Sequence, residues 1–207
     1  MPNDFGAFAP VFESPHGYLA LLNLSSDDSL EAVRLVQRCA TIDPDRTSIL
    51  ALLSDLNWRP TLVAAVAAAF MPLDTRILDA LWHRFDAGSW VVPQIAVILA
   101  TIDPDFQPQA RQRLEAHCPL DSSELRALTM PERHSAAGPA SGAQRSAKAA
   151  SALQAILSAA VPQPDWLPVV IASPEHQDLV ALDQDSAGWI AQCWADRFAQ
   201  IRKQLQP

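Results

Sequence analysis

A short motif recurs along this 207-residue chain at the spacing of one two-helix unit. The segment NWRPTLVA at residues 57–64 returns as SWVVPQIA at 89–96 and as DWLPVVIA at 165–172. Each copy has a polar residue, a Trp, a Pro and an apolar run, and the first two tryptophans, Trp58 and Trp90, lie 32 residues apart. Repeats of this length are usually pairs of helices that stack on their neighbours. The chain is therefore expected to fold as an array of helical hairpins.

A second motif, ATIDPD, occurs at residues 40–45 and again at 100–105. In each copy an aspartate precedes a proline, which is typical of a helix start because the missing N–H of proline would be unpaired in the first turn anyway. Asp43 is therefore predicted to cap a helix that begins at Pro44, and Asp103 occupies the same position in the second copy. Capping explains these aspartates better than an acid–base pair across the array does.

Apolar spacing predicts two further helices. One begins near Asp28, where Asp28 and Glu31 have the spacing of a capping box. The other lies near the C-terminal end, where large apolar residues recur every three or four positions. They are Ile190, Trp194, Phe198, Ile201 and Leu205. This last helix is expected to cap the array.

Together these patterns divide one all-α domain into four segments. Residues 1–25 hold aromatic residues among three prolines and predict an irregular arm that packs over one end. Residues 26–133 carry the hairpins. Residues 134–147, rich in Ser, Ala and Gly, predict a flexible loop. Residues 148–207 are expected to form the C-terminal helices and the cap.

The repeat pattern resembles that of the HEAT family, whose repeats have a leucine-rich first helix, an aspartate in a tight turn and a second helix rich in Ala and Val. The resemblance is clearest over residues 48–104. It departs from the family at residues 62–63 and 95–96, where no arginine accompanies the apolar pair. The resemblance implies a short right-handed solenoid and a scaffold that binds other proteins, but a fold alone does not supply an activity.

Two predicted second helices contain runs without any charge, at residues 62–70 and 95–99. An ordinary surface helix keeps a polar face. Either both helices are buried all round or one of them exposes an apolar surface for a partner. Burial is favoured, because a large exposed apolar surface promotes aggregation.

The charge balance limits the classes of partner. The chain has 15 Lys and Arg against 23 Asp and Glu, a net charge of −8, and no cluster of bases, so nucleic acid is not expected to bind. Acidic residues are concentrated at 1–58 and 165–196, which would steer a basic partner there, although a solvated acidic exterior is the plainer explanation. No apolar run approaches the roughly 20 residues that span a bilayer, and the N-terminus lacks a secretory signal. The expected location is cytoplasmic.

No pattern in the sequence predicts a cofactor, a metal or catalysis. The three cysteines form no CxxC pair, and His117 and Cys118 are neighbours whose side chains would diverge on a helix. Residues 183–188 begin like a calcium loop, but Trp194 stands where a bidentate Glu is needed. The chain is therefore predicted not to be an enzyme.

The favoured function is a non-catalytic protein–protein interaction module, in its narrowest form a bacterial immunity or inhibitor protein that blocks a toxin. The candidate partner-binding residues lie on a charged first helix, and they are Arg76, Asp79, Trp82, His83 and Arg84. The repeated tryptophans at 58, 90 and 166 are assigned to packing between repeats. One alternative is an enzyme whose site is dispersed over the helices, for instance at His83, Arg84 and Asp86. Another is a structural subunit of a larger complex.

Overall fold

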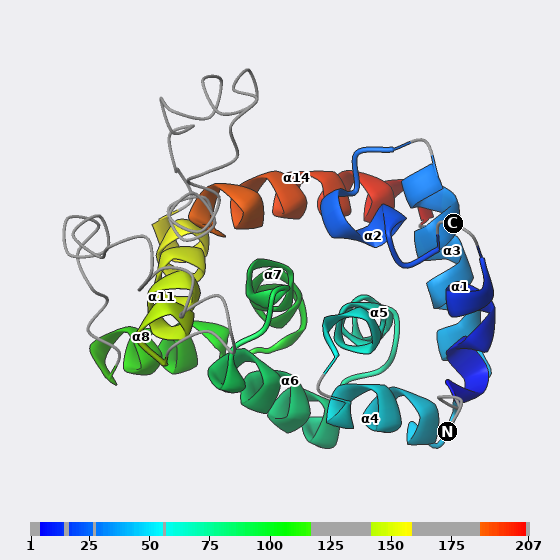
Figure 1. The fold of residues 1–207 in the computed structure, drawn as a ribbon, viewed down its shortest axis with the longest axis horizontal. Helices are drawn as coiled ribbons and strands as arrows, with labels where there is room; N and C mark the ends of the chain where they lie inside the picture. The colour runs from blue at the N-terminus through cyan, green and yellow to red at the C-terminus, as the bar shows by residue number, and fades with distance from the viewer. Residues whose placement is uncertain are drawn as a thin grey trace, which may run out of the picture.

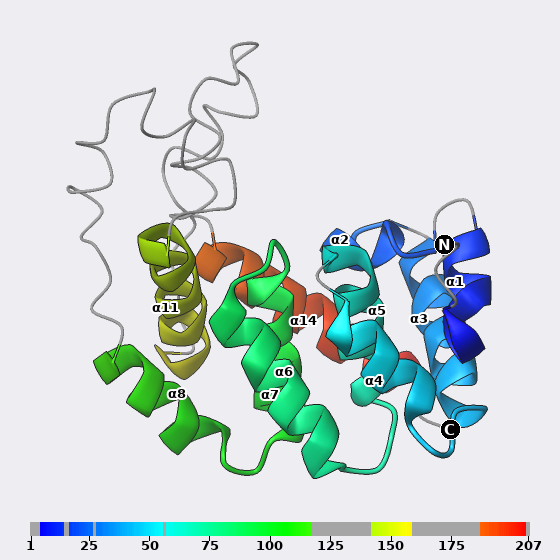
Figure 2. The same ribbon diagram turned by 60° about the horizontal axis from the view of Figure 1, so that its bottom comes forward.

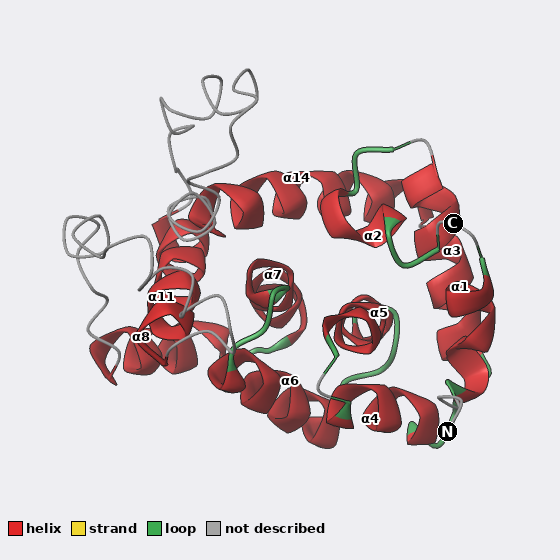
Figure 3. Cartoon of the chain, in the orientation of Figure 1, coloured by secondary structure: helices red, strands yellow, loops and turns green. Residues whose placement is uncertain are grey.

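The computed structural model describes residues 5–14, 17–26, 28–55, 57–116, 142–158 and 187–205. Within these ranges all regular secondary structure is helical (Figure 3), so the predicted all-α class is confirmed. The elements are the 3-10 helix η1 (Gly6–Phe8) and the α-helices α1 (Ala9–Glu13), α2 (Ala20–Asn23), α3 (Asp28–Thr41), α4 (Thr47–Ser54), α5 (Trp58–Ala68), α6 (Thr75–Ala87), α7 (Val92–Ile102), α8 (Phe106–Ala116), α11 (Gly142–Ser158) and α14 (Ala187–Leu205).

The helices are arranged around a central pair, α5 and α7 (Figure 1). Helices α4 and α5 form one hairpin and α6 and α7 form the next, with α4 against α6 and α5 against α7. On the opposite side of the central pair lie α14 and α2, while α3 with α1 closes one end and α11 closes the other. The connections leading into α5 and α7 lie on one side of the molecule, and those leaving them lie on the other (Figure 2).

Burial of the two central helices follows from their composition and is confirmed. Every residue from 60 to 68 in α5 and from 92 to 99 in α7 is buried. Because neither stretch carries a charge, each can be surrounded on all sides without stranding an ionised group in the interior. The alternative of an exposed apolar face on these helices is therefore wrong.

Asp43 pairs with the first turn of α4, as a capping side chain would, although the N-cap position itself is occupied by Arg46. Its carboxylate accepts hydrogen bonds from the backbone N–H groups of Ser48 and Ile49, at 3.1 and 3.0 Å. The helix itself does not begin at Pro44 but at Thr47, because Arg46 adopts a left-handed conformation with φ of 64°. The carboxylate thus reaches across a short turn to donors that would otherwise be unpaired in the first turn of α4.

Two segment boundaries expected from the sequence need correction. The arm at residues 1–25 is not irregular where it is described, because η1, α1 and α2 lie within it and bury Phe8 and Val11 completely. Pro10 is compatible with helix because it lies in the first turn of α1. The flexible loop expected at 134–147 is wrong for residues 142–147, which belong to α11. Residues 134–141 lie outside the described ranges.

Helix α14 has the predicted apolar stripe but not the predicted position. Trp194, Phe198 and Ile201 are buried, in keeping with their spacing. Instead of covering the end of the array, α14 runs along it and contacts α11, α7 and α3 (Figure 1). The indole N–H of Trp194 donates to the Leu21 carbonyl at 2.9 Å, and the ring of Phe198 meets that of Phe70 edge to face. Among the described helices none is long and apolar enough to span a bilayer.

Candidate functional site

The five candidate residues on α6 do not share one surface. Arg76, Asp79 and His83 are exposed, and partner binding through them stays a prediction. Trp82 and Arg84 are only 4% and 5% exposed, so their expected place on the surface is wrong. Successive residues on a helix are turned by about 100°, and a consecutive Trp-His-Arg triplet therefore cannot present all three side chains to one partner.

Trp82 joins α6 to the helices that follow it. Its indole N–H donates to Oδ2 of the buried Asp103 at 2.7 Å. The guanidinium carbon of Arg113, on α8, lies 3.9 Å from the centroid of the Trp82 ring. Arg113 also binds both carboxylate oxygens of Asp86, at 2.8 and 2.9 Å. This arrangement ties the second hairpin to α8 and gives Trp82 a packing role.

Arg84 faces the opposite side of α6, towards the first hairpin. Burial lowers the pKa of its guanidinium, and the carboxylate of Asp55 partly counters this shift. Meanwhile His83 is exposed and Asp86 is bound to Arg113. The polar groups suggested for a dispersed enzyme site therefore do not converge on a pocket. Within the described ranges, no three His, Cys, Asp or Glu side chains are grouped closely enough to hold a metal ion.

A different surface carries one exposed and three half-buried aromatic residues. It follows α2 and the starts of α5, α7 and α14, which lie along the upper side of the molecule in Figure 2. We call it the aromatic edge and define it by Tyr18, Leu19, Leu22, Trp58, Trp90 and Trp189. Four separate parts of the sequence contribute to it: Tyr18 contacts Trp58, Leu22 lines a groove with Trp189, and Trp90 precedes α7.

At the start of α5, the ring of Trp58 meets that of Tyr18 edge to face, with centroids 6.2 Å apart. Both rings are half-buried, and the exposed Arg59 lies over them. Its guanidinium carbon is 5.1 Å from the Trp58 centroid and 5.6 Å from the Tyr18 centroid. Tyrosine, tryptophan and arginine are the residue types most enriched where partners bind tightly.

At the start of α7, Trp90 is 75% exposed, the highest value among the large hydrophobic side chains described as exposed. The ammonium nitrogen of Lys148, on α11, lies 5.5 Å from the centroid of its ring. The amide of Gln94 donates to the Leu22 carbonyl at 2.9 Å and so links α7 to α2. The expectation that the repeated tryptophans pack between repeats is therefore wrong for Trp90, while Trp166 lies outside the described residues.

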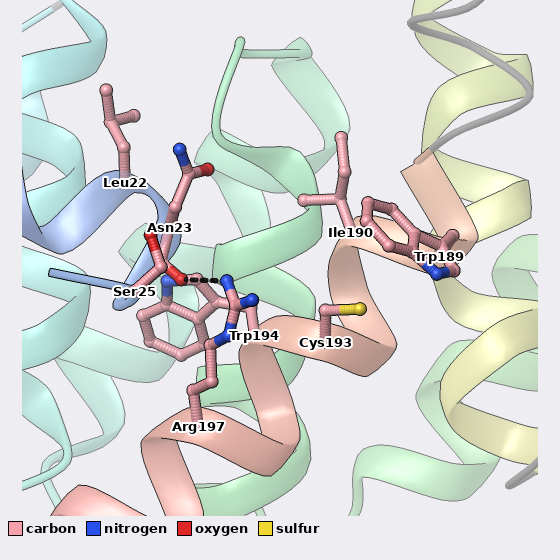
Figure 4. A pocket seen from close by; sticks show the side chains of 8 residues that line it. All are labelled: Leu22, Asn23, Ser25, Trp189, Ile190, Cys193, Trp194 and Arg197. Atoms are coloured by element: carbon pink, nitrogen blue, oxygen red, sulfur yellow. Dashed lines mark hydrogen bonds between the residues drawn. The ribbon is translucent and has the colours of Figure 1, made fainter. Parts of the chain in front are cut away.

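Between α2 and the start of α14 lies a groove of about 230 Å³ (Figure 4). One wall comes from the α2 side and the other from α14, and the lining residues are Leu22, Asn23, Ser25, Trp189, Ile190, Cys193, Trp194 and Arg197. Arg197 donates to the Asn23 carbonyl at 2.8 Å and holds the two walls together. Burial raises the pKa of the Cys193 thiol, so this thiol stays protonated at neutral pH. The groove is thus mainly apolar, with one cation.

The charge around the edge differs from that of the whole chain. Acidic and basic side chains are equal in number among the described residues, so the net charge of −8 comes from the rest of the sequence. At the aromatic edge, Arg59 lies over the ring of Trp58 and Lys148 lies near the ring of Trp90. The third cation, Arg197, lines the groove. Among the described residues, therefore, the edge carries no acidic surface that would steer a basic partner.

Sequence reasoning missed most of this edge. Trp58 with Arg59 is recognisable as a pair of binding-type residues, but the sequence gives no sign that Tyr18 lies beside them. Comparisons with known proteins add no further assignment, since no family model, curated protein or solved structure matches the chain.

Proposed function

We propose that this chain is a protein-binding module and that the aromatic edge is its binding surface. The observation that carries the proposal is the exposure of Trp90 together with the half-exposed Tyr18, Trp58 and Trp189 on one side of the fold. A tryptophan exposed to water lacks the hydrophobic free energy that burial of its side chain would contribute. With about 150–250 Å² of side-chain surface, covering the exposed part of Trp90 would contribute about 4 kcal/mol of gross hydrophobic free energy.

The arrangement of the polar groups on α6 favours a binding module over an enzyme whose site is dispersed over the helices. His83, Arg84 and Asp86 point in different directions, and two of the three are already engaged by other parts of the fold. A binding surface needs no such convergence. It needs apolar anchors and a polar rim, which the aromatic edge supplies through its tryptophans and the neighbouring cations.

The finer architecture is also a proposal. Stacking of the α4–α5 hairpin on the α6–α7 hairpin supports a HEAT-like arrangement for this part of the chain. In such an arrangement the segments of Trp58 and Trp90 fall on one edge, because each leads into the second helix of its hairpin. This would explain why a sequence repeat and an exposed aromatic surface coincide.

Site-specific photo-crosslinking in cells tests the proposed function. Benzoylphenylalanine replaces Leu19 or Trp90 at the aromatic edge. Leu73 serves as a matched control because it is a 57% exposed hydrophobic residue in the connection from α5 to α6, and this connection lies on the opposite side of the molecule in Figure 2. The expected result is one discrete crosslinked protein at positions 19 and 90 and none at 73. Crosslinking at 73 alone, or none at any position, would exclude the edge as the binding surface. A stoichiometric, salt-resistant complex would assign the chain as a structural subunit.

A further inference from the structure

Arg59 is a cation whose guanidinium has no hydrogen-bonding partner among the described residues. It is exposed, lies over the rings of Trp58 and Tyr18, and makes no ion pair or side-chain hydrogen bond with any described residue. A guanidinium has five N–H donors in its plane, and contact with aromatic faces leaves these donors available to an acceptor. The two rings hold the guanidinium in place, so less conformational entropy is lost when an anion binds to it.

At its position in α5, Arg59 does not stabilise the helix. It lies in the first turn of α5, where a positive charge opposes the helix dipole. Asn57 already caps this helix by accepting from the Arg59 backbone N–H at 3.1 Å. The carboxylate of Asp55 accepts from the Asn57 backbone N–H and interacts electrostatically with Arg84, and it forms no ion pair with Arg59.

A second cation borders the apolar part of the edge. Arg197 lines the groove and uses one terminal nitrogen to donate to the Asn23 carbonyl, which fixes its guanidinium at the rim (Figure 4). Leu22 and Ile190 contribute apolar surface on opposite walls of the same groove. The edge therefore offers an apolar groove with Arg197 at its rim and a second cation, Arg59, at the start of α5.

We propose that the aromatic edge binds an acidic amphipathic segment of a partner protein, an inference that rests on the proposed function. Carboxylates of the segment pair with Arg59 and Arg197, and its aliphatic side chains enter the groove between Leu22 and Ile190. This reverses the partner charge expected from the sequence alone. A protein is favoured over nucleic acid because separate cations suit single carboxylates, whereas a phosphate backbone needs a continuous basic track, and the described residues of the edge form no such track.

The test uses model helices of about 18 residues, or five turns, with leucine on one face and glutamate, glutamine or lysine on the other. Fluorescence anisotropy measures the binding of each peptide and of a single-stranded oligothymidine to the full chain. The glutamate peptide is expected to bind about tenfold more tightly than the glutamine peptide at low salt, and the lysine peptide most weakly. R59E should weaken the glutamate peptide about tenfold and restore binding of the lysine peptide, while L73A should change neither.

Equal affinity for the glutamate and lysine peptides, an unchanged affinity in R59E, or binding of no peptide would each overturn the inference. Tighter binding of oligothymidine than of the glutamate peptide would overturn it in favour of a nucleic-acid ligand. None of these outcomes alone refutes the proposed function, which fails only if the crosslinkers at Leu19 and Trp90 capture no protein. Circular dichroism verifies that R59E is folded, and folding is expected because an acidic residue suits the first turn of α5.

Discussion

Replacement of Trp82 by Phe should destabilise the fold more than replacement of Trp194 by Phe. Both tryptophans are buried, at 4% and 1% exposure, and each donates one indole hydrogen bond, so the two variants lose similar apolar area. Their acceptors differ, because Trp82 binds the carboxylate of Asp103 at 2.7 Å and Trp194 binds the neutral carbonyl of Leu21 at 2.9 Å. A hydrogen bond to a charged group contributes about 1.5–3 kcal/mol, against about 0.5–1.5 kcal/mol for a neutral one.

The difference between the two variants should therefore be about 1 kcal/mol in the free energy of unfolding. With an m-value of about 2 kcal/mol/M, the urea midpoint of W82F falls about 0.5 M below that of W194F. Fluorescence and circular dichroism should give coincident transitions, which justifies a two-state treatment. A double-mutant cycle of W82F with D103N should give a coupling energy of about 1 kcal/mol. Equal midpoints for the two single variants, with additive effects in the cycle, would refute the role assigned to the charged acceptor.

Three further predictions follow from burial and pairing. A65E places a charge at a fully buried position of α5 and should abolish the cooperative thermal transition, whereas A100E, at an exposed position of α7, should keep it; a folded A65E would contradict the enclosure of α5. R113A should lower the free energy of unfolding by about 1–2 kcal/mol because it loses both an ion pair and an aromatic contact. R76A, which loses only an exposed ion pair, should leave the urea midpoint unchanged. Similar midpoints for the two variants would argue against the contacts of Arg113. The raised pKa of Cys193 predicts that peptide-resolved alkylation at this residue is slower than for free cysteine at pH 8 and accelerates as the pH rises, so a fast reaction at neutral pH would disagree with its burial.

Burial was predictable where one property, such as the absence of charge or a regular apolar spacing, extends over a whole segment. Residues 62–68 of α5 are uncharged at all angles around the helix, and that pattern permits full burial. The apolar spacing of α14 likewise fixes which side of the helix is buried. Neither pattern specifies which helices pack against each other. The sequence therefore predicted an end cap, whereas α14 lies along the stacked hairpins.

The candidate site was less predictable because small local differences change where a side chain points. Trp58 is the first residue of α5, whereas Trp90 lies in the turn before α7, since the second copy of the motif has one more residue between Trp and Pro. The same motif position is therefore half-buried in one copy and exposed in the other. Tyr18 contacts Trp58 only because the N-terminal segment folds back onto α5. No periodic pattern in the sequence predicts a contact between positions so far apart.

The enclosure of α5 and α7 has a consequence for how the protein is made. Both helices are synthesised well before α14, and the hydrogen bond that fastens α14 to α2 joins residues 173 positions apart. Until that late segment leaves the ribosome, the uncharged residues 92–99 of α7 lack the wall that α14 provides and offer apolar surface to other nascent chains. Pairing over such a separation also slows folding, because a long loop must close first. We therefore expect chaperones to protect the nascent chain until α14 docks.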